Sequence, residues 1–274
     1  MKETLIINRR RRGPYYRMDE AHSHDAYEIY YLVFGNRRFF INDTIYYIKP
    51  GDLVVIPKGE IHRTSFDSDS THERLYVYFP EDYLADLFER YGRRTILECF
   101  SSPQVPVPAN RRGYLEDLFL RMEAEYEHGD KFSDQLLRSY LAELLFFILR
   151  CRDYHSQTGG REITGGDARM QEAARYVARE FRQELTLESV AAFMGLSAPY
   201  FSRKFKEATG FGFREYLVHV RIRNATALLL ETQKSVTQIA YECGFNDSNY
   251  FGDVFKKVKG LSPLRYRKGK GNFA

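Results

Sequence analysis

Tryptophan is absent from this chain of 274 residues, and cysteine is scarce. The three cysteines, Cys99, Cys151 and Cys243, lie far apart, and no two of them form a CxxC pair. An odd number of widely spaced cysteines argues against a disulfide framework and against a cysteine-rich zinc site. The chain is therefore expected to work in a reducing cytoplasm.

Long hydrophobic runs are also missing. The longest apolar stretch, residues 141–149, is interrupted by Glu143 and is far shorter than the ~20 residues that cross a bilayer. The arginines at positions 9–12 are not followed by an apolar segment, so no secretory signal is expected. The sequence predicts no membrane partner.

The net charge of +4 is unevenly distributed along the chain. Residues 167–274 hold 18 Lys and Arg against 11 Asp and Glu, a surplus of 7, whereas residues 1–166 are slightly acidic. A basic surplus suits contact with a polyanion, although it is also common on an ordinary solvated surface.

Turn signals divide the first part of the chain into short strands. Runs rich in β-branched and aromatic residues, at 27–34, 38–41, 45–48 and 53–56, are separated by Gly- and Asn/Asp-containing turns. This pattern is typical of a barrel or sandwich. Three prolines between residues 101 and 108 then mark a connection that cannot be regular helix.

Two amphipathic helices are expected between residues 111 and 155. Apolar residues recur at helical spacing from Leu115 to Met122, and a second, wider stripe runs from Leu137 to Leu149. The width of the second stripe favours burial against another copy of the chain; the alternative is that both helices simply cover the barrel. Residues 156–166 are small, polar and glycine-rich, as in a linker.

Residues 167–274 contain an internal duplication, in which residues 187–216 recur as residues 236–266. Each copy starts with a short helix that ends at a glycine, Gly195 or Gly244, as expected of a C-cap. Ser197 in the first copy, and Asn246 or Asp247 in the second, stand where a second helix would be capped. These patterns predict helix-turn-helix units at residues 187–208 and 236–258, joined by a longer helix from Phe213 to Leu230.

The second copy carries the stretches Ile239-Ala240-x3-Gly244-Phe245, Tyr250-Phe251-x3-Phe255-Lys256-Lys257 and Gly260-x-Ser262-Pro263-x2-Tyr266-Arg267. With them, residues 167–274 resemble the DNA-binding domain of AraC/XylS-type transcription regulators. The resemblance implies a bacterial DNA-binding regulator, more often an activator than a repressor, with double-stranded DNA and RNA polymerase as partners.

The DNA-contacting residues that this resemblance implies lie on the second helix of each unit. They are Ser197, Tyr200, Ser202, Arg203, Lys204, Lys206, Asn246, Ser248, Asn249, Lys256 and Lys257. At Gly252-Asp253 the chain departs from the family pattern. Because an acidic side chain repels phosphate, the second recognition helix is expected to contribute less affinity than the first.

A histidine pattern lies in the β-rich part. It reads His22-x-His24-x3-Glu28-x6-Gly35, followed by Gly51-x5-Pro57-x-Gly59-x2-His62. On a strand, the spacing would place His22, His24 and Glu28 on one face. The pattern resembles both motifs of the cupin barrel, in which three histidines and a glutamate bind a divalent metal, but it lacks the first motif's leading glycine and the second motif's final asparagine.

Two uses of these four residues remain open. Imidazole and carboxylate suit zinc, iron, nickel or manganese. Alternatively, His22, His24, Glu28 and His62 line a metal-free effector pocket together with Tyr30, Phe39 and Tyr47. A sugar is the effector that family resemblance favours.

The sequence therefore predicts a two-domain protein. An N-terminal all-β, cupin-like barrel (residues 1–110) with appended helices (residues 111–155) would sense a small molecule and form a homodimer. A C-terminal all-α domain with two helix-turn-helix motifs would bind DNA. The alternative function is a metal-dependent cupin enzyme with accessory DNA-binding modules, which would need a metal with an open coordination position.

Overall fold

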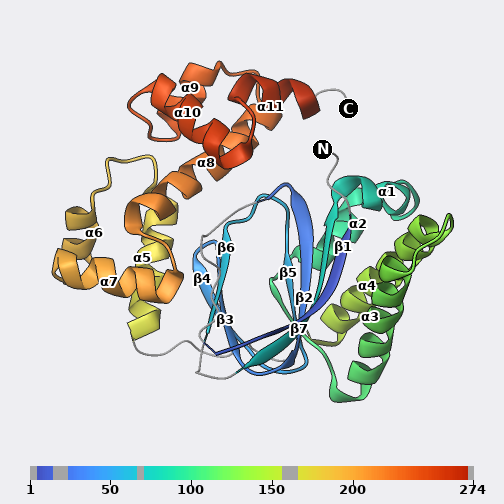
Figure 1. Ribbon diagram of the computed structural model, residues 1–274. Coiled ribbons are helices and arrows are strands. Elements are labelled where there is room, and N and C mark those ends of the chain that lie inside the picture. Colours follow the sequence, from blue (N-terminus) through green and yellow to red (C-terminus); the bar gives the residue numbers. More distant parts are fainter. Residues whose placement is uncertain (1–4, 15–23, 67–70, 156–165, 271–274) are drawn as a thin grey trace.

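The computed structural model describes residues 5–14, 24–66, 71–155 and 166–270. It has a β-rich N-terminal domain and a helical C-terminal domain, so the predicted fold class is confirmed (Figure 1). The segment predicted as a linker, residues 156–166, lies outside the described residues except for its last residue, which begins a helix.

Antiparallel strands form two sheets that face each other. One sheet has the order β1-β7-β2-β5-β8 and the other β4-β3-β6. Their bounds are β1 Ile6–Arg12, β2 Ala26–Phe34, β3 Arg37–Ile41, β4 Thr44–Ile48, β5 Asp52–Ile56, β6 His62–Phe66, β7 His72–Pro80 and β8 Gln104–Pro106. The four runs predicted as strands correspond to β2–β5 and begin within one residue of the observed starts.

Alternation along the strands gives each sheet two different faces. On β2, Tyr27, Ile29 and Tyr31 belong to a core shared with helices, whereas Tyr30 and Leu32 belong to the barrel interior. The interior also holds Phe39, Ile41, Ile48, Val54 and Ile56. The barrel is therefore packed with apolar side chains over part of its length.

Helices cover the outer face of the five-stranded sheet (Figure 1). They are the short α1 Ala85–Tyr91 and α2 Arg93–Leu97, which the sequence did not predict, and the longer α3 Arg112–Glu127 and α4 Ser133–His155. The wide stripe of α4, including Leu141, Leu144 and Leu145, is buried in the same core as the sheet. The barrel itself therefore covers this stripe, as the alternative interpretation had it, and dimerisation through these helices stays a prediction.

The described part of the C-terminal domain is helical. Its helices are α5 Gly166–Glu180, α6 Leu187–Phe193, α7 Ala198–Thr209, α8 Phe213–Glu231, α9 Val236–Glu242, α10 Ser248–Lys259 and α11 Pro263–Lys270. Of these, α6–α10 lie in the sequence positions that the duplication predicted, whereas α5 and α11 were not predicted. Among the described residues, no helix is both long and apolar enough to cross a membrane.

The two domains are in contact through the outer face of the three-stranded sheet. Phe40, Ile45 and Ile61 of the barrel share one buried cluster with the helices of the C-terminal domain. The Phe40 ring lies 5.8 Å from that of Phe211 and 5.6 Å from that of Tyr216. Hydrogen bonds also cross between the domains: Arg38 Nη2 donates to the carbonyl oxygen of Glu207 at 2.6 Å, Ile45 N donates to Gln171 Oε1 at 2.8 Å, and Arg223 Nη1 donates to Glu60 Oε2 at 3.2 Å.

Candidate DNA-binding surface and effector site

The first helix-turn-helix unit consists of α6 and α7. Thr186 and Ser189 cap the start of α6 reciprocally, and Gly195 forms the turn at a φ of +65°, which an L-residue rarely adopts. Ser197 is the N-cap of α7 but makes no side-chain hydrogen bond there. Helix α7 buries Phe201, Phe205 and Ala208, so its opposite face is free to meet a partner.

The second unit consists of α9 and α10. Ser235 and Gln238 form the predicted capping box of α9. Gly244 takes a φ of +82°, and a side chain there would lie 2.7 Å from the carbonyl oxygen of Phe181. The cap of α10 is Asp247, whose Oδ1 accepts hydrogen bonds from the backbone of Asn249 and Tyr250, so the alternative cap Asn246 is excluded.

Most of the residues predicted to contact DNA are exposed on these helices. Ser197, Tyr200, Arg203, Lys206, Asn246, Asn249, Lys256 and Lys257 are exposed, while Ser202, Lys204 and Ser248 are half-buried. Lys204 Nζ lies 2.7 Å from Glu207 Oε2, so its charge is already partly matched within α7. The guanidinium of Arg203 lies 5.8 Å from the ring centre of Tyr200.

One exposed residue of α10 was missed by the sequence analysis. Tyr250 is 55% exposed and stands 50 positions after Tyr200, which is 43% exposed. The repeat offset was the signal that could have identified it. Between the two units, the 19 residues of α8 give a spacer about 28 Å long, close to one turn of DNA.

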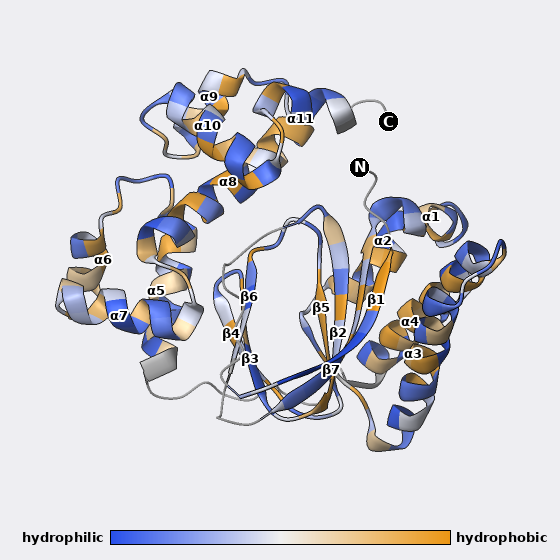
Figure 2. Cartoon of the chain, viewed as in Figure 1, coloured by the Kyte–Doolittle hydropathy of each residue, from blue (hydrophilic) through white to orange (hydrophobic). Residues whose placement is uncertain are grey.

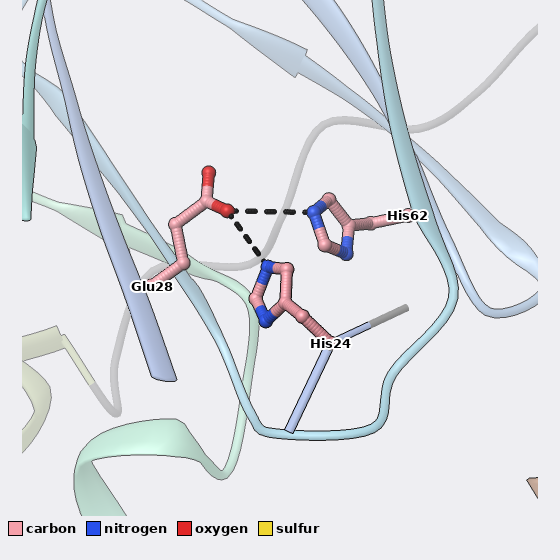
Figure 3. A group of neighbouring side chains, drawn as sticks. All are labelled: His24, Glu28 and His62. Atoms are coloured by element: carbon pink, nitrogen blue, oxygen red, sulfur yellow. Dashed lines mark hydrogen bonds and ion pairs between the residues drawn. The ribbon is translucent and has the colours of Figure 1, made fainter. Parts of the chain in front are cut away.

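The barrel brings together three of the four predicted histidine and glutamate residues (Figure 3). Glu28 Oε2 lies 3.2 Å from His24 Nε2 and 3.4 Å from His62 Nε2. Glu28 and His62 are buried, and His24 is partly buried. His22 lies outside the described residues.

The outer nitrogen of each imidazole is fixed by the backbone. His24 Nδ1 donates to the carbonyl oxygen of Ala26 at 2.9 Å, and His62 Nδ1 donates to that of Glu60 at 3.0 Å. In a neutral imidazole the Nε2 atoms would then be acceptors facing a carboxylate that also accepts. The arrangement therefore needs a further proton between the carboxylate and the rings, or a cation at the centre.

The pKa values agree with a strongly coupled group. Burial is the largest single influence on Glu28 and raises its pKa, but hydrogen bonds from His24 and His62 together lower it well below the usual value. Burial likewise lowers the pKa of His62, but the hydrogen bond and charge of Glu28 raise it overall. A charged Glu28–His62 pair is the form that these shifts favour.

The aromatic residues predicted to line the effector site separate into two places. Tyr30 and Phe39 lie inside the barrel, with ring centres 4.8 Å apart. Tyr47 does not lie with them: it packs against the cluster of the C-terminal domain, because successive residues of β4 face opposite sides. Tyr78, whose ring centre lies 4.8 Å from that of His24, belongs to the site and was missed.

Comparison with known proteins assigns both domains. Residues 6–145 match the family model described as AraC-like ligand binding domain, and residues 190–269 match a helix-turn-helix domain. The transcriptional activator RhaR of Mannheimia succiniciproducens is 28% identical over 255 residues, covering 90% of this chain and 86% of the relative. RhaR of an Enterobacter species is 24% identical with the same coverage. A structure of ToxT from Vibrio cholerae covers 97% of this chain and 98% of its own at 15% identity, with a TM-score of 0.39.

Proposed function

Because the chain belongs to the family of AraC-type transcription regulators, which are DNA-binding proteins and not enzymes, we propose that it activates transcription when its barrel binds a small-molecule effector. Family membership removes the alternative of a cupin enzyme with accessory DNA-binding modules. The two similar RhaR proteins are named transcriptional activators, which supports activation over repression.

The observation that carries the proposal is the pair of helix-turn-helix units on one rigid spacer. Helices α7 and α10 each expose a polar face, and α8 separates them by about one turn of DNA. Arg203 is suited to reading a guanine, whereas Lys206, Lys256 and Lys257 are suited to phosphate contacts. Asp253 occupies the position of Arg203 in the second unit, so α10 binds mainly through Asn249 and its lysines.

The test is selection of bound sequences from a random DNA pool by the full chain at near-physiological salt, where non-specific binding is weak. We expect a motif with two elements about one helical turn apart. A double variant, Lys256→Ala with Lys257→Ala, should weaken binding to all sequences without changing the motif. Recovery of no motif, with or without candidate effectors, would contradict the proposal.

A chain of contacts connects the barrel interior to the DNA-binding domain. His62 is hydrogen-bonded to the backbone of Glu60, and Glu60 Oε2 lies 3.2 Å from Arg223 Nη1 on α8. A ligand that displaces His62 would therefore also act on the helix between the two DNA-reading units. This connection supports control of DNA binding by the barrel, provided that the ligand favours one arrangement over the other.

The remaining partners follow from the proposed role. A second copy of the chain is proposed to bind at the outer side of α4, where a groove of about 570 Å³ is lined by residues such as Arg138, Ala142 and Phe146. RNA polymerase is the proposed target of activation, and the cytoplasm the proposed location. Light scattering of the full chain, with Ala142→Arg as the disrupting variant, tests the dimer.

A divalent metal is a second candidate occupant of the barrel. The three ligand atoms of His24, Glu28 and His62 lie within 4.8 Å of one another, and the backbone bonds to each Nδ1 orient the rings as in metal sites. A bound cation would supply a coordination position for an oxygen of the effector. Metal analysis of protein purified without chelator should find about one equivalent, which Glu28→Gln should abolish; no metal in the unaltered protein would exclude this occupant.

A further inference from the structure

The inner wall of the barrel carries positive side chains at the end away from Glu28. In the pairing of β1 with β7, Arg12 lies opposite His72, and Arg10 lies opposite Arg74. Directly opposed residues share a face of the sheet, and the other face of β7 holds Leu75 and Val77 in the core beneath the helices. Arg12, His72 and Arg74 therefore face the interior. Figure 2 shows β1 changing from orange to blue along its length toward this end.

Arg37 enters the same region from the opposite sheet. It stands two residues before Phe39, which belongs to the barrel interior, and its side chain is only 2% exposed. Its Nη2 donates to Thr64 Oγ1 at 3.3 Å. Burying a charged guanidinium costs free energy, and an anionic ligand would offset this cost. A neutral, apolar ligand would not.

Arg74 is held in a position to bind a ligand. Its guanidinium carbon lies 4.7 Å from the ring centre of Tyr76 and 5.4 Å from that of Tyr30. Stacking on ring faces leaves the in-plane N–H groups available to a carboxylate. In the part of the chain that the structure describes, Arg74 makes no hydrogen bond or ion pair, and Arg74 and Tyr76 remain partly accessible to solvent.

The electrostatic environment agrees with this placement. Burial first, and then the positive charges of Arg37, Arg74 and Arg12, lower the pKa of His72 to about 4. At the other end of the barrel, Glu28 Oε2 already lies 3.2 Å from His24 Nε2 and 3.4 Å from His62 Nε2, and its carboxylate would repel an anion. An anion entering the barrel would therefore be drawn to the arginine end.

We propose that the effector is a hydroxylated carboxylic acid of about the size of one sugar ring, such as a sugar acid, with its carboxylate between Arg37 and Arg74 and near Arg12. On β2, Leu32 lies opposite Arg74 and Glu28 lies opposite Tyr78. Leu32 and Glu28 are four residues apart, so the backbone at the arginine end lies about 13 Å from the backbone at Glu28. Glu28 Oε1 points away from both imidazoles in Figure 3 and would accept a hydrogen bond from a ligand hydroxyl. This inference rests on the proposed function, because it names the class of molecule that the barrel senses.

The test compares acids with their neutral counterparts on the full chain. D-galacturonate and D-glucuronate differ from D-galactose and D-glucose only at C6, and binding is measured by titration calorimetry and by the melting temperature. At least one acid should bind and raise the melting temperature, and its neutral counterpart should not. Arg74→Met should weaken binding of that acid about 10–100-fold, since one charge-assisted contact is lost.

Arg11→Met is the matched control, because Arg11 is on the same strand as Arg12, faces the opposite side of the sheet and is exposed. It removes the same charge and should leave the affinity unchanged. If Arg74→Met fails to fold, Arg12→Met takes its place. Neutral sugars that bind as tightly as the acids, an acid that binds the Arg74 variant unchanged, or no binding by either acid would overturn this inference. A protein that still selects a DNA motif in those cases would leave the proposed function intact.

Discussion

Arg203 and Asp253 occupy the same position in the two recognition helices, 50 residues apart, and both are exposed. Only the arginine can donate two hydrogen bonds to guanine O6 and N7. Arg203→Ala should therefore relax specificity at one base position at a cost of about 1–3 kcal/mol. Competition binding against single-base variants of the selected site measures this effect. Unchanged affinity ratios across those variants would show that Arg203 does not read a base.

His72 gives a pH dependence that can be separated from that of the other titrating groups. Its folded-state pKa of about 4 lies below the ordinary value of 6.5, so the unfolded chain binds the proton more readily between these values. The free energy of unfolding should then fall by about 1.4 kcal/mol for each unit that the pH decreases within this window. Urea titrations at pH 4.5, 5.5 and 6.5 should show a flatter profile for His72→Gln. Parallel profiles for the two proteins would contradict the assignment.

For single residues, the sequence could predict which residue types form the site better than it could predict which side of a sheet each residue faces. His24, Glu28 and His62 were identified because a motif places their residue types at fixed spacing, and they do meet. Tyr47 was misplaced because which face of β4 points inward depends on the C-terminal domain that covers its other face. Arg37 and Arg74 were missed for a similar reason: their strands pair with partners far away in the sequence.

The N-cap residues of the two recognition helices are expected to contribute differently to the free energy of unfolding. Asp247 accepts two backbone hydrogen bonds at the start of α10, whereas Ser197 makes no side-chain hydrogen bond at the start of α7. Asp247→Ala should lower the free energy of unfolding by about 1 kcal/mol, and Ser197→Ala should lower it by clearly less. Denaturant titration of both variants provides the comparison. An equal loss would mean that the two caps act through backbone conformation alone.

Local signals explain which elements were predictable. Strands β2–β5 are separated by tight turns, and α9 begins with a capping box, so both could be located from a few neighbouring residues. Helices α1 and α2 have 7 and 5 residues, and neither has a side-chain cap at its start. They exist because they pack on the sheet, and that contact is not visible in a short stretch of sequence.

At the scale of the whole molecule, the packing of one domain on the other could not be predicted from either domain alone. Phe39 and Phe40 are consecutive, and both are almost fully buried. Phe39 is buried by the barrel, whereas Phe40 is buried by Phe211 and Tyr216 of the C-terminal domain. The same region contains the hydrogen bond from Arg38 to the end of α7 and the ion pair between Glu60 and Arg223.

This pair of neighbours makes domain packing testable with matched substitutions. Phe40→Ala should leave the barrel folded but weaken its contact with the C-terminal domain, so the radius of gyration from X-ray scattering should increase. Phe39→Ala should instead destabilise the barrel by about 3–5 kcal/mol, with the domains of the folded fraction still in contact. If the contact restrains α7 and α8, the Phe40 variant should also bind its selected DNA site with an affinity that no longer responds to the effector. A Phe40 variant with unchanged dimensions and an unchanged effector response would show that the ion pair and the Arg38 hydrogen bond are sufficient to hold the domains together.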